Sequence, residues 1–323
     1  MHATIDFVTF AADNYAGWIE YWLSSATRSN PESRLYVYDV SAKPSGALAS
    51  LVAQVPNAQC IPWPEHSWQA PDWVADTDFR FFWPGFNLRE EIKYLSRRLR
   101  FKLSAKKKHD WMVDKRTFVA EKQFFIRICC QKPYIIRDAL SRSDRSLAYV
   151  DADAVVLHHF PGYPAADSDF AVTVVDREQV RIGGAWEPPG PDGPLPVILI
   201  NAGVMFANQT EGARGLLDLW INELSRVRHG ACDQTALANL IYRHDQRFHE
   251  TAASVRIKTR AGDAIVAGLP CARYNQVRIA RDGSGIDSDA AIAHFVGSWK
   301  QAEHRDRVGE AIHQAWRRRG LAD

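Results

Sequence analysis

Short apolar runs rich in β-branched and aromatic residues alternate with amphipathic segments along this chain. Strands are predicted over residues 5–10, 33–40, 147–157, 168–176 and 197–208. Helical spacing of apolar residues follows the first strand after residue 15 and recurs over residues 121–143, 213–227 and 232–242. A strand, a loop over residues 11–15, a helix and a second strand open the chain, which predicts an α/β fold with a mixed, mainly parallel central sheet.

Ligands of open α/β sheets bind outside the carboxyl ends of the strands. The loop Ala11-Ala12-Asp13-Asn14-Tyr15 follows the first predicted strand, and Asp39 lies near the end of the second. These residues are therefore candidates for contacts with a ligand.

The strand over residues 147–157 contains two carboxylates, Asp151 and Asp153, separated by one alanine. Residues i and i+2 of a strand point to the same face, so both could project together if the strand continues through them. Two neighbouring carboxylates suit a hard divalent cation such as Mg²⁺ or Mn²⁺, while a polar turn is the alternative interpretation. Three further Asp-x-Asp pairs, beginning at Asp76, Asp167 and Asp287, lie in turn-like contexts and are interpreted as structural.

Other polar residues interrupt apolar segments. Asn201 and Gly203 break the strand over 197–208, which indicates either a β-bulge or a ligand contact. Asp233 and Gln234 lie at a predicted helix start, where Asp233 could also be an N-cap. His294 follows another short apolar run, and a single histidine is more often structural than a ligand.

Composition limits the class of protein. The chain has 323 residues, is 46% hydrophobic and carries a formal net charge of only +2, which favours a globular protein and gives no indication of nucleic-acid binding. Its five cysteines have no paired metal-site spacing. With no predicted signal peptide or membrane-spanning run, we expect a cytoplasmic protein.

Residues 60–118 depart from the regular alternation and contain a basic, aromatic insertion. Between Arg80 and Arg116 there are twelve Lys and Arg residues against four acidic ones. A solvated helix docked on the core would explain this pattern. An anionic acceptor, or peripheral attachment to the inner face of a membrane, would explain it too. The end of the chain adds a short basic tail.

Taken in order, the loop over residues 11–15, Asp151-Ala-Asp153, Asn201-Ala-Gly203, Asp233-Gln234 and the segment from His294 to Lys300 resemble motifs of the GT-A glycosyltransferases of family eight. That family includes bacterial lipopolysaccharide galactosyl- and glucosyltransferases and glycogenin. The motifs extend from residue 9 to residue 300. The resemblance implies a Rossmann-like GT-A fold in a single domain over residues 1–323, apart from the insertion and the tail.

The resemblance also implies roles for individual residues. Asp151, Asp153 and His294 would bind Mn²⁺ or Mg²⁺, and Gly297 and Lys300 would contact the diphosphate of a nucleotide-sugar. Base and ribose contacts would come from Ala11, Asp13, Asn14 and Tyr15, with Asp39 and Gly203 as further contacts to the nucleotide-sugar. Arg127 and Asn201 would contact the donor sugar, and Asp233, Gln234 and Asp176 would lie at the reaction centre.

These implications predict a metal-dependent retaining hexosyltransferase. The donor would be a UDP-hexose such as UDP-glucose, UDP-galactose or UDP-GlcNAc, and the acceptor a glycan, a lipid-linked sugar or another group. Two alternatives remain open at the level of sequence. One is a metal-dependent nucleotidyltransferase or nucleotide-sugar hydrolase, and the other is a non-catalytic nucleotide-sugar-binding module.

Overall fold

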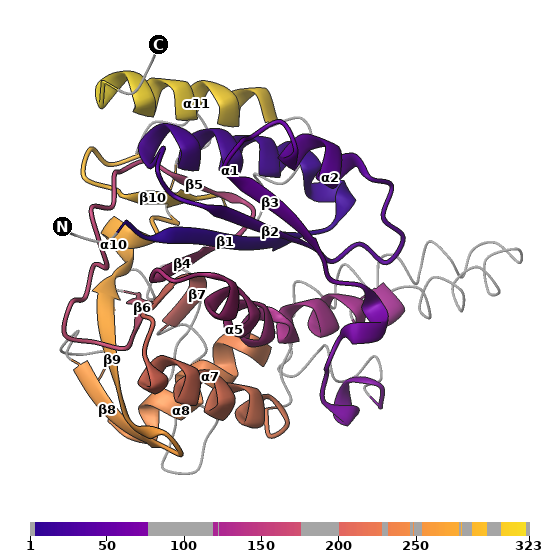
Figure 1. Cartoon of the computed structure of the whole chain (residues 1–323), viewed down its shortest axis with the longest axis vertical. Helices are drawn as coiled ribbons and strands as arrows, with labels where there is room; N and C mark the ends of the chain where they lie inside the picture. Colours follow the sequence, from indigo (N-terminus) through magenta and orange to yellow (C-terminus); the bar gives the residue numbers. More distant parts are fainter. Residues whose placement is uncertain are drawn as a thin grey trace, which may run out of the picture.

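An eight-stranded sheet forms the centre of the protein (Figure 1). The computed structural model describes residues 4–76, 119–121, 123–175, 200–227, 232–245, 248, 254–277, 279, 286–295 and 305–320. The strands are β1 Asp6–Ala11, β2 Leu35–Asp39, β3 Ala58–Pro62, β4 Leu147–Val150, β6 Phe170–Val174, β7 Ile200–Ala207, β8 Ser254–Thr259 and β9 Gly262–Pro270. A separate pair consists of β5 Ala154–Val156 and β10 Ile292–His294.

Strand order in the large sheet is β3-β2-β1-β4-β7-β6-β9-β8. Strands β3, β2, β1, β4, β6 and β9 run in one direction, and β7 and β8 run against them. The sheet is therefore mixed and mainly parallel, which confirms the fold class expected from the sequence. All five strands predicted from the apolar runs are present, whereas β3, β8 and β9 were not predicted.

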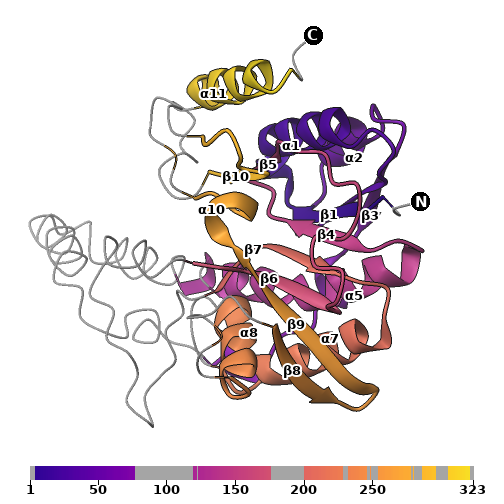
Figure 2. The ribbon, with the colours of Figure 1, turned by 90° about the vertical axis from the view of Figure 1, so that its left-hand side faces the viewer.

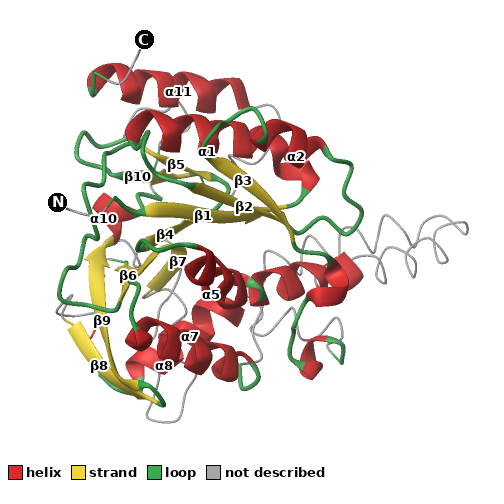
Figure 3. Cartoon of the chain, in the orientation of Figure 1, coloured by secondary structure: helices red, strands yellow, loops and turns green. Residues whose placement is uncertain are grey.

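Helices cover both faces of this sheet (Figures 1 and 3). On one face lie α1 Ala16–Ser29 and α2 Ala47–Val52, and on the other α5 Lys132–Arg142, α7 Glu211–Leu224 and α8 Cys232–Tyr242. Alternation along β1 explains the two layers, because Phe7 packs with Trp22 of α1, whereas Val8 faces the cluster that contains Ile135 and Trp220.

The C-terminal helix α11, Arg305–Arg318, packs outside α1 and over the β5–β10 pair (Figure 2). Its buried residues include Val308, Ile312 and Trp316, which join Phe295 and Leu157 in a third apolar cluster. The short helix α10, Cys271–Tyr274, follows β9 directly. Among the helices in the described ranges, none combines the length and the apolar composition that crossing a bilayer requires.

One detail of the predicted strand over 147–157 is wrong. The chain leaves the sheet at Asp151, where it forms a turn closed by a hydrogen bond from the backbone N–H of Ala154 to the carbonyl of Asp151, 3.0 Å long. It then enters β5, which pairs with β10 instead of the large sheet. Asp151 and Asp153 therefore come together through a turn at the carboxyl end of β4, and not through strand periodicity.

The basic stretch of the insertion, from Arg80 to Arg116, lies outside the described residues. Of the segment from 60 to 118, the structure describes residues 60–76, which complete β3 and form two 3₁₀ turns, Glu65–Ser67 and Asp72–Val74. Trp73 is buried in the second turn, where its indole N–H donates to the carbonyl of Leu224 at 3.1 Å. This part of the segment is therefore packed on the main core.

Candidate metal centre and its cavity

Two carboxylates and one imidazole converge where β4 ends. Ligand atoms of Asp151, Asp153 and His294 lie within 4.8 Å of one another. The Nε2 atom of His294 is 3.1 Å from Asp153 Oδ1 and 3.7 Å from Asp151 Oδ2. Asp153 and His294 are buried, so water screens electrostatic interactions at this place only weakly.

The antiparallel pair β5–β10 brings these ligands together from distant parts of the sequence. His294 is the register partner of Ala154, the residue after Asp153. The backbone N–H of Phe295 donates to the carbonyl of Asp153 at 2.9 Å, which extends the pairing by one bond. This short antiparallel ladder therefore holds two of the three candidate ligands, Asp153 and His294, close together.

The donor set fits a divalent cation. Two carboxylates so close together repel each other unless a positive charge lies between them. Carboxylate oxygens favour Mg²⁺ and Mn²⁺, and an imidazole nitrogen is compatible with Mn²⁺ and other first-row ions. With three protein ligands, such an ion keeps positions for oxygen atoms of a substrate.

Asp151 is held by two further side chains. The hydroxyl of Tyr149 donates to its Oδ1 atom at 2.6 Å, and the ammonium of Lys132 lies 3.3 Å from the same oxygen. Since both partners occupy Oδ1, the Oδ2 atom is the one closer to His294. Burial and the neighbouring Asp151 carboxylate raise the pKa of the Tyr149 phenol well above its ordinary value, which keeps it a hydrogen-bond donor.

Lys132 is a buried cation that links the candidate metal ligand Asp151 to Asp233 of α8. Its ammonium lies 2.9 Å from Asp233 Oδ2, 3.3 Å from Asp151 Oδ1 and 2.9 Å from the carbonyl of Ala202. Burial acts to lower the pKa of Lys132, but the carboxylates of Asp151 and Asp233 outweigh it and raise the pKa above the ordinary lysine value. The side chain is therefore a fixed positive charge beside the candidate metal site.

Asp233 and Gln234 lie in the first turn of α8. Asp233 is buried, and its carboxylate accepts from Lys132. Gln234 accepts a hydrogen bond through Oε1 from the backbone N–H of Ala202 at 3.1 Å. Both residues are thus close to the segment of β7 that carries Asn201 and Gly203.

The bulge that Asn201 and Gly203 indicate is present. Pairing between β6 and β7 changes register between Val172 and Thr173, where Val172 opposes Met205 and Thr173 opposes Asn201. Inside the bulge, Asn201 Oδ1 accepts from the N–H of Gly203 at 2.9 Å, and the carbonyl of Gly203 accepts from the N–H of Asp151 at 2.8 Å. Gly203 therefore supports the candidate metal ligand Asp151 through its backbone.

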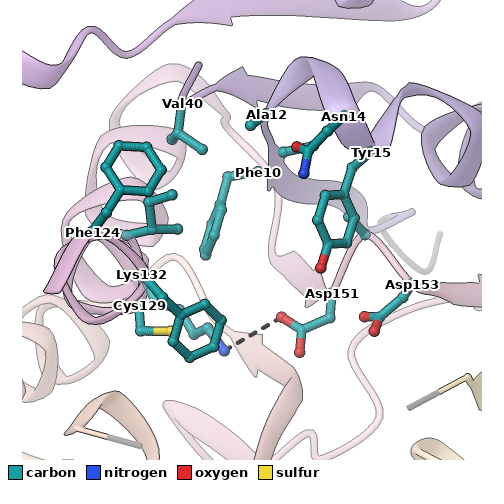
Figure 4. A pocket seen from close by; sticks show the side chains of 14 residues that line it. Phe10, Ala12, Asn14, Tyr15, Val40, Phe124, Cys129, Lys132, Asp151 and Asp153 are labelled. Carbon is teal, nitrogen blue, oxygen red and sulfur yellow. Dashed lines mark ion pairs between the residues drawn. The ribbon is translucent and has the colours of Figure 1, made fainter. Parts of the chain in front are cut away.

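A cavity of about 350 Å³ opens beside the carboxylates (Figure 4). Asp151, Ala152, Asp153 and Lys132 line one part of it. Ala11, Ala12, Asn14 and Tyr15 of the first loop line another, together with Phe10 at the end of β1. Three of the four loop residues expected to contact base and ribose, Ala11, Asn14 and Tyr15, thus share one cavity with two of the candidate metal ligands.

The remaining wall of this cavity is apolar and was not predicted. It consists of Val40 and of four side chains from the helical residues 123–130, namely Phe124, Phe125, Ile128 and Cys129. The pairs 124/128 and 125/129 have the i, i+4 spacing that places side chains on one side of a helix. Phe125 is 52% exposed, so the rim of the cavity is apolar as well.

Three other predicted contacts have protein partners in this structure. The Asp13 carboxylate accepts from the backbone N–H groups of Ser45 and Leu48 at the start of α2, and the Ser45 bond lowers its pKa. Asp39 Oδ1 accepts from the N–H of Ser41 at 2.9 Å. Arg127, which does not line the cavity, donates to Glu65 at 2.7 Å.

Asp176, Gly297 and Lys300 lie outside the described residues. Of the other Asp-x-Asp pairs, Asp169 accepts from the N–H of Ile265 at 2.7 Å, and Asp287 accepts from the side-chain amide of Gln276 at 2.9 Å. These contacts are structural, which agrees with the interpretation of these two Asp-x-Asp pairs from the sequence.

The fold resembles that of known glycosyltransferase structures at low sequence identity. The bifunctional glycosyltransferase WbbM is 13% identical, with 98% of this chain and 52% of that chain covered and a TM-score of 0.50. The galactosyltransferase LgtC, solved with donor and acceptor sugar analogs, is 14% identical, with coverage of 98% and 100% and a TM-score of 0.45. GlyE of Streptococcus pneumoniae TIGR4 is 14% identical, with coverage of 99% and 64% and a TM-score of 0.45.

The match to WbbM establishes a GT-A glycosyltransferase fold, and this chain spans about half the length of that protein. The fold expected from the sequence motifs is thereby confirmed. No protein-family model matches the chain. No curated protein matches it in sequence either.

Proposed function

We propose that the protein is a metal-dependent retaining glycosyltransferase that moves a hexose from a nucleotide-sugar, with UDP-glucose, UDP-galactose or UDP-GlcNAc as donor, to a glycan, a lipid-linked sugar or another acceptor. One observation carries the proposal: Asp151, Asp153 and His294 gather at the border of a cavity that the loop of residues 11–15 also lines. The catalytic unit is taken as one domain over residues 1–323.

Asp151, Asp153 and His294 would hold Mn²⁺ or Mg²⁺. Such an ion stabilises the negative charge that develops on the leaving diphosphate, more strongly in the transition state than in the ground state. Ala11, Asn14 and Tyr15 would bind the nucleoside, with the apolar wall around Phe124 excluding water from the base. Gly297 and Lys300 keep their proposed role at the diphosphate.

The hexose would lie beyond Lys132, toward Asp233, Gln234 and Asn201, which are outside the lining of the cavity itself. Asp233 is already paired with Lys132, so its carboxylate is a fixed neighbour of the sugar and a poor base. Gln234, one residue further along α8, would lie beside the anomeric carbon, with Asn201 as a neighbouring sugar contact. Because Lys132 offsets one of the two negative charges of Asp151 and Asp233, more of the positive charge of the ion remains available to the diphosphate.

Product analysis tests this proposal against its rivals. The wild-type protein is incubated with Mn²⁺, a panel of nucleotide-sugars carrying ¹³C at the anomeric position, and a set of mono- and oligosaccharide acceptors. A glycosyltransferase releases nucleoside diphosphate, and a ¹³C signal for a new glycoside of unchanged anomeric configuration appears. In a parallel reaction with added pyrophosphate, formation of sugar 1-phosphate and nucleoside triphosphate would indicate nucleotidyl transfer. Free sugar in equal yield with and without acceptors would indicate a hydrolase.

A protein that binds a nucleotide-sugar without catalysis would give a different result in the same assay. It would be stabilised against heat by one nucleotide-sugar and Mn²⁺ while leaving every nucleotide-sugar intact. Chelation of the ion with EDTA provides the control, because it should abolish both turnover and thermal stabilisation if Asp151, Asp153 and His294 bind as proposed.

A further inference from the structure

A chain of buried hydrogen bonds runs from the β7 bulge to His294. The hydroxyl of Thr173 lies 2.7 Å from the carbonyl of Asn201. The same hydroxyl is 3.0 Å from Asn275 Nδ2, and Asn275 Oδ1 is 2.9 Å from His294 Nδ1. Thr173 and Asn275 have no exposed surface, so water does not compete for these bonds.

The proton positions along this series of hydrogen bonds follow from which of its atoms can donate a proton. The hydroxyl proton of Thr173 has two carbonyl neighbours, Asn201 at 2.7 Å and Val204 at 3.3 Å, and carbonyls only accept. When the hydroxyl donates to either one, its oxygen is left to accept from Asn275. The group of Asn275 that faces Thr173 must therefore be the NH₂, which also lies 3.4 Å from the carbonyl of Asn201.

Turning the amide around would be unfavourable. Asn275 Oδ1 would then stand where Nδ2 now is, about as close to the carbonyl oxygen of Asn201, and two acceptors would face each other without a proton. The NH₂ would in turn point at Nδ1 of His294. The buried surroundings thus fix the amide with its oxygen toward the imidazole.

Because Asn275 Oδ1 can only accept, Nδ1 of His294 must carry the proton. In the neutral ring the lone pair then belongs to Nε2, which is the nitrogen that faces Asp153 and Asp151. We propose that Asn275 and Thr173 are positioning residues that fix His294 in the Nδ1–H tautomer, so that Nε2 is its metal-binding atom.

This proposal rests on the metal site of the proposed function, and it adds two residues that do not touch the ion. Residues that orient a ligating histidine change metal affinity about 10- to 100-fold when replaced. Thr173 and Asn275 are 102 positions apart in the sequence, and neither belongs to a motif of the family resemblance.

Calorimetry with Mn²⁺ alone, without nucleotide, gives the first test. Asn275→Leu removes the acceptor and should weaken Mn²⁺ binding about tenfold or more. Asn275→Asp keeps an oxygen facing Nδ1, although its second oxygen replaces the NH₂ that faces Thr173 and should lower stability, so it should bind Mn²⁺ more tightly than Asn275→Leu. Equal losses in both variants would overturn the proposal, because a merely structural asparagine would not distinguish them.

Thr173 supplies a second pair of variants for the case that Asn275→Leu does not fold. Thr173→Val preserves the shape of the side chain and removes the hydroxyl, and we expect weaker Mn²⁺ binding. Thr173→Ser keeps the hydroxyl and should bind as the wild type does. Unchanged affinity in Thr173→Val would count against the proposal.

The tautomer itself is read by NMR of protein labelled with ¹⁵N at histidine, with ¹¹³Cd²⁺ as a diamagnetic probe. His294→Gln identifies the signals of residue 294 among the eleven histidines. Coupling of cadmium to Nε2, with Nδ1 still protonated, is the expected result. Coupling to Nδ1 would overturn this inference and leave the proposed function standing, whereas no binding of Mn²⁺ or Cd²⁺ by the wild type would overturn both.

Discussion

The imidazole of His294 lies against the backbone of Gly203 so closely that a Cβ atom at residue 203 would stand 2.4 Å from His294 Cε1 and 2.7 Å from Nδ1. Real Cβ atoms do not approach other atoms to such distances. A glycine is therefore required at this place for the imidazole to reach the two aspartates. The same glycine accepts from the N–H of Asp151, so one residue of the bulge supports two candidate ligands.

Gly203→Ala should displace His294 and weaken Mn²⁺ binding about tenfold or more, since the ring cannot keep both its contact with Asn275 and its distance to Asp153. Isothermal calorimetry measures the affinity. Gly212→Ala is the matched control, because a Cβ there would meet the Asp169 carboxylate at 2.6 Å, away from the site. We expect it to lower stability without changing Mn²⁺ affinity, and equal metal affinities in the two variants would refute the role given to Gly203.

From the ion pair between Lys132 and Asp233 we predict a contribution to the free energy of unfolding. Both side chains are less than 10% exposed, with 7% for Lys132 and 8% for Asp233. Lys132→Met leaves two carboxylates without their buried countercharge and should cost about 3–5 kcal/mol of unfolding free energy. Urea denaturation followed by circular dichroism measures this loss.

A double-mutant cycle shows whether the loss comes from the pair. Lys132→Met combined with Asp233→Asn removes both charges, so the destabilisation should be clearly less than the sum of the two single changes. Arg137 and Asp218 form a control pair on the surface, with side chains 44% and 58% exposed. Removing that pair should have little effect. Additive losses at Lys132 and Asp233 would mean that the two charges act independently.

The sequence predicted the parts of this architecture that depend on local pattern. Short apolar runs identified five strands of the sheet, and the position of Asp151 directly after such a run distinguished one Asp-x-Asp pair from three others. The β8–β9 hairpin was missed although its signal is visible, since Val255 and Ile257 are buried and alternate with exposed Arg256 and Lys258.

The remaining features depend on contacts between distant residues. A lysine at the start of a helix is usually solvated, so nothing local marks Lys132 as the partner of Asp151 and Asp233. Asn275 follows a helix of four residues after an unpredicted strand, and its importance arises only when β10 places His294 beside it. Conversely, Arg127 matches a family position in the sequence but pairs with Glu65 in the fold.

Removal of a metal ligand should abolish the stabilisation that Mn²⁺ gives. A ligand present at 100 times its dissociation constant stabilises the native state by about 2.7 kcal/mol, which corresponds to a rise of several degrees in Tm. We expect this rise, and Mn²⁺-dependent binding of UDP, in the wild type and not in Asp153→Ala. Asp167→Ala, an exposed aspartate of another Asp-x-Asp pair, is the control and should behave as the wild type does. A full thermal shift in Asp153→Ala would show that Mn²⁺ binds elsewhere.

A substitution at Tyr149 distinguishes an effect on Mn²⁺ affinity from an effect on the stability of the protein. Its hydroxyl donates to Asp151 Oδ1 at 2.6 Å, and Tyr149→Phe removes this bond while preserving the ring that packs against Lys132. Asp151 would then be held through Oδ1 by Lys132, and Mn²⁺ affinity should fall up to about tenfold. Loss of a hydrogen bond to a charged group should also cost about 1.5–3 kcal/mol of stability.

Tyr38→Phe is the matched control for this change. Tyr38 is equally buried, and its hydroxyl also donates to a carboxylate, that of Asp138, away from the cavity. Both variants should lose stability to a similar degree in urea denaturation, while calorimetry should find weaker Mn²⁺ binding in Tyr149→Phe alone. If the two variants bound Mn²⁺ equally well, the hydroxyl of Tyr149 would have no part in orienting Asp151, and Lys132 would suffice for that task.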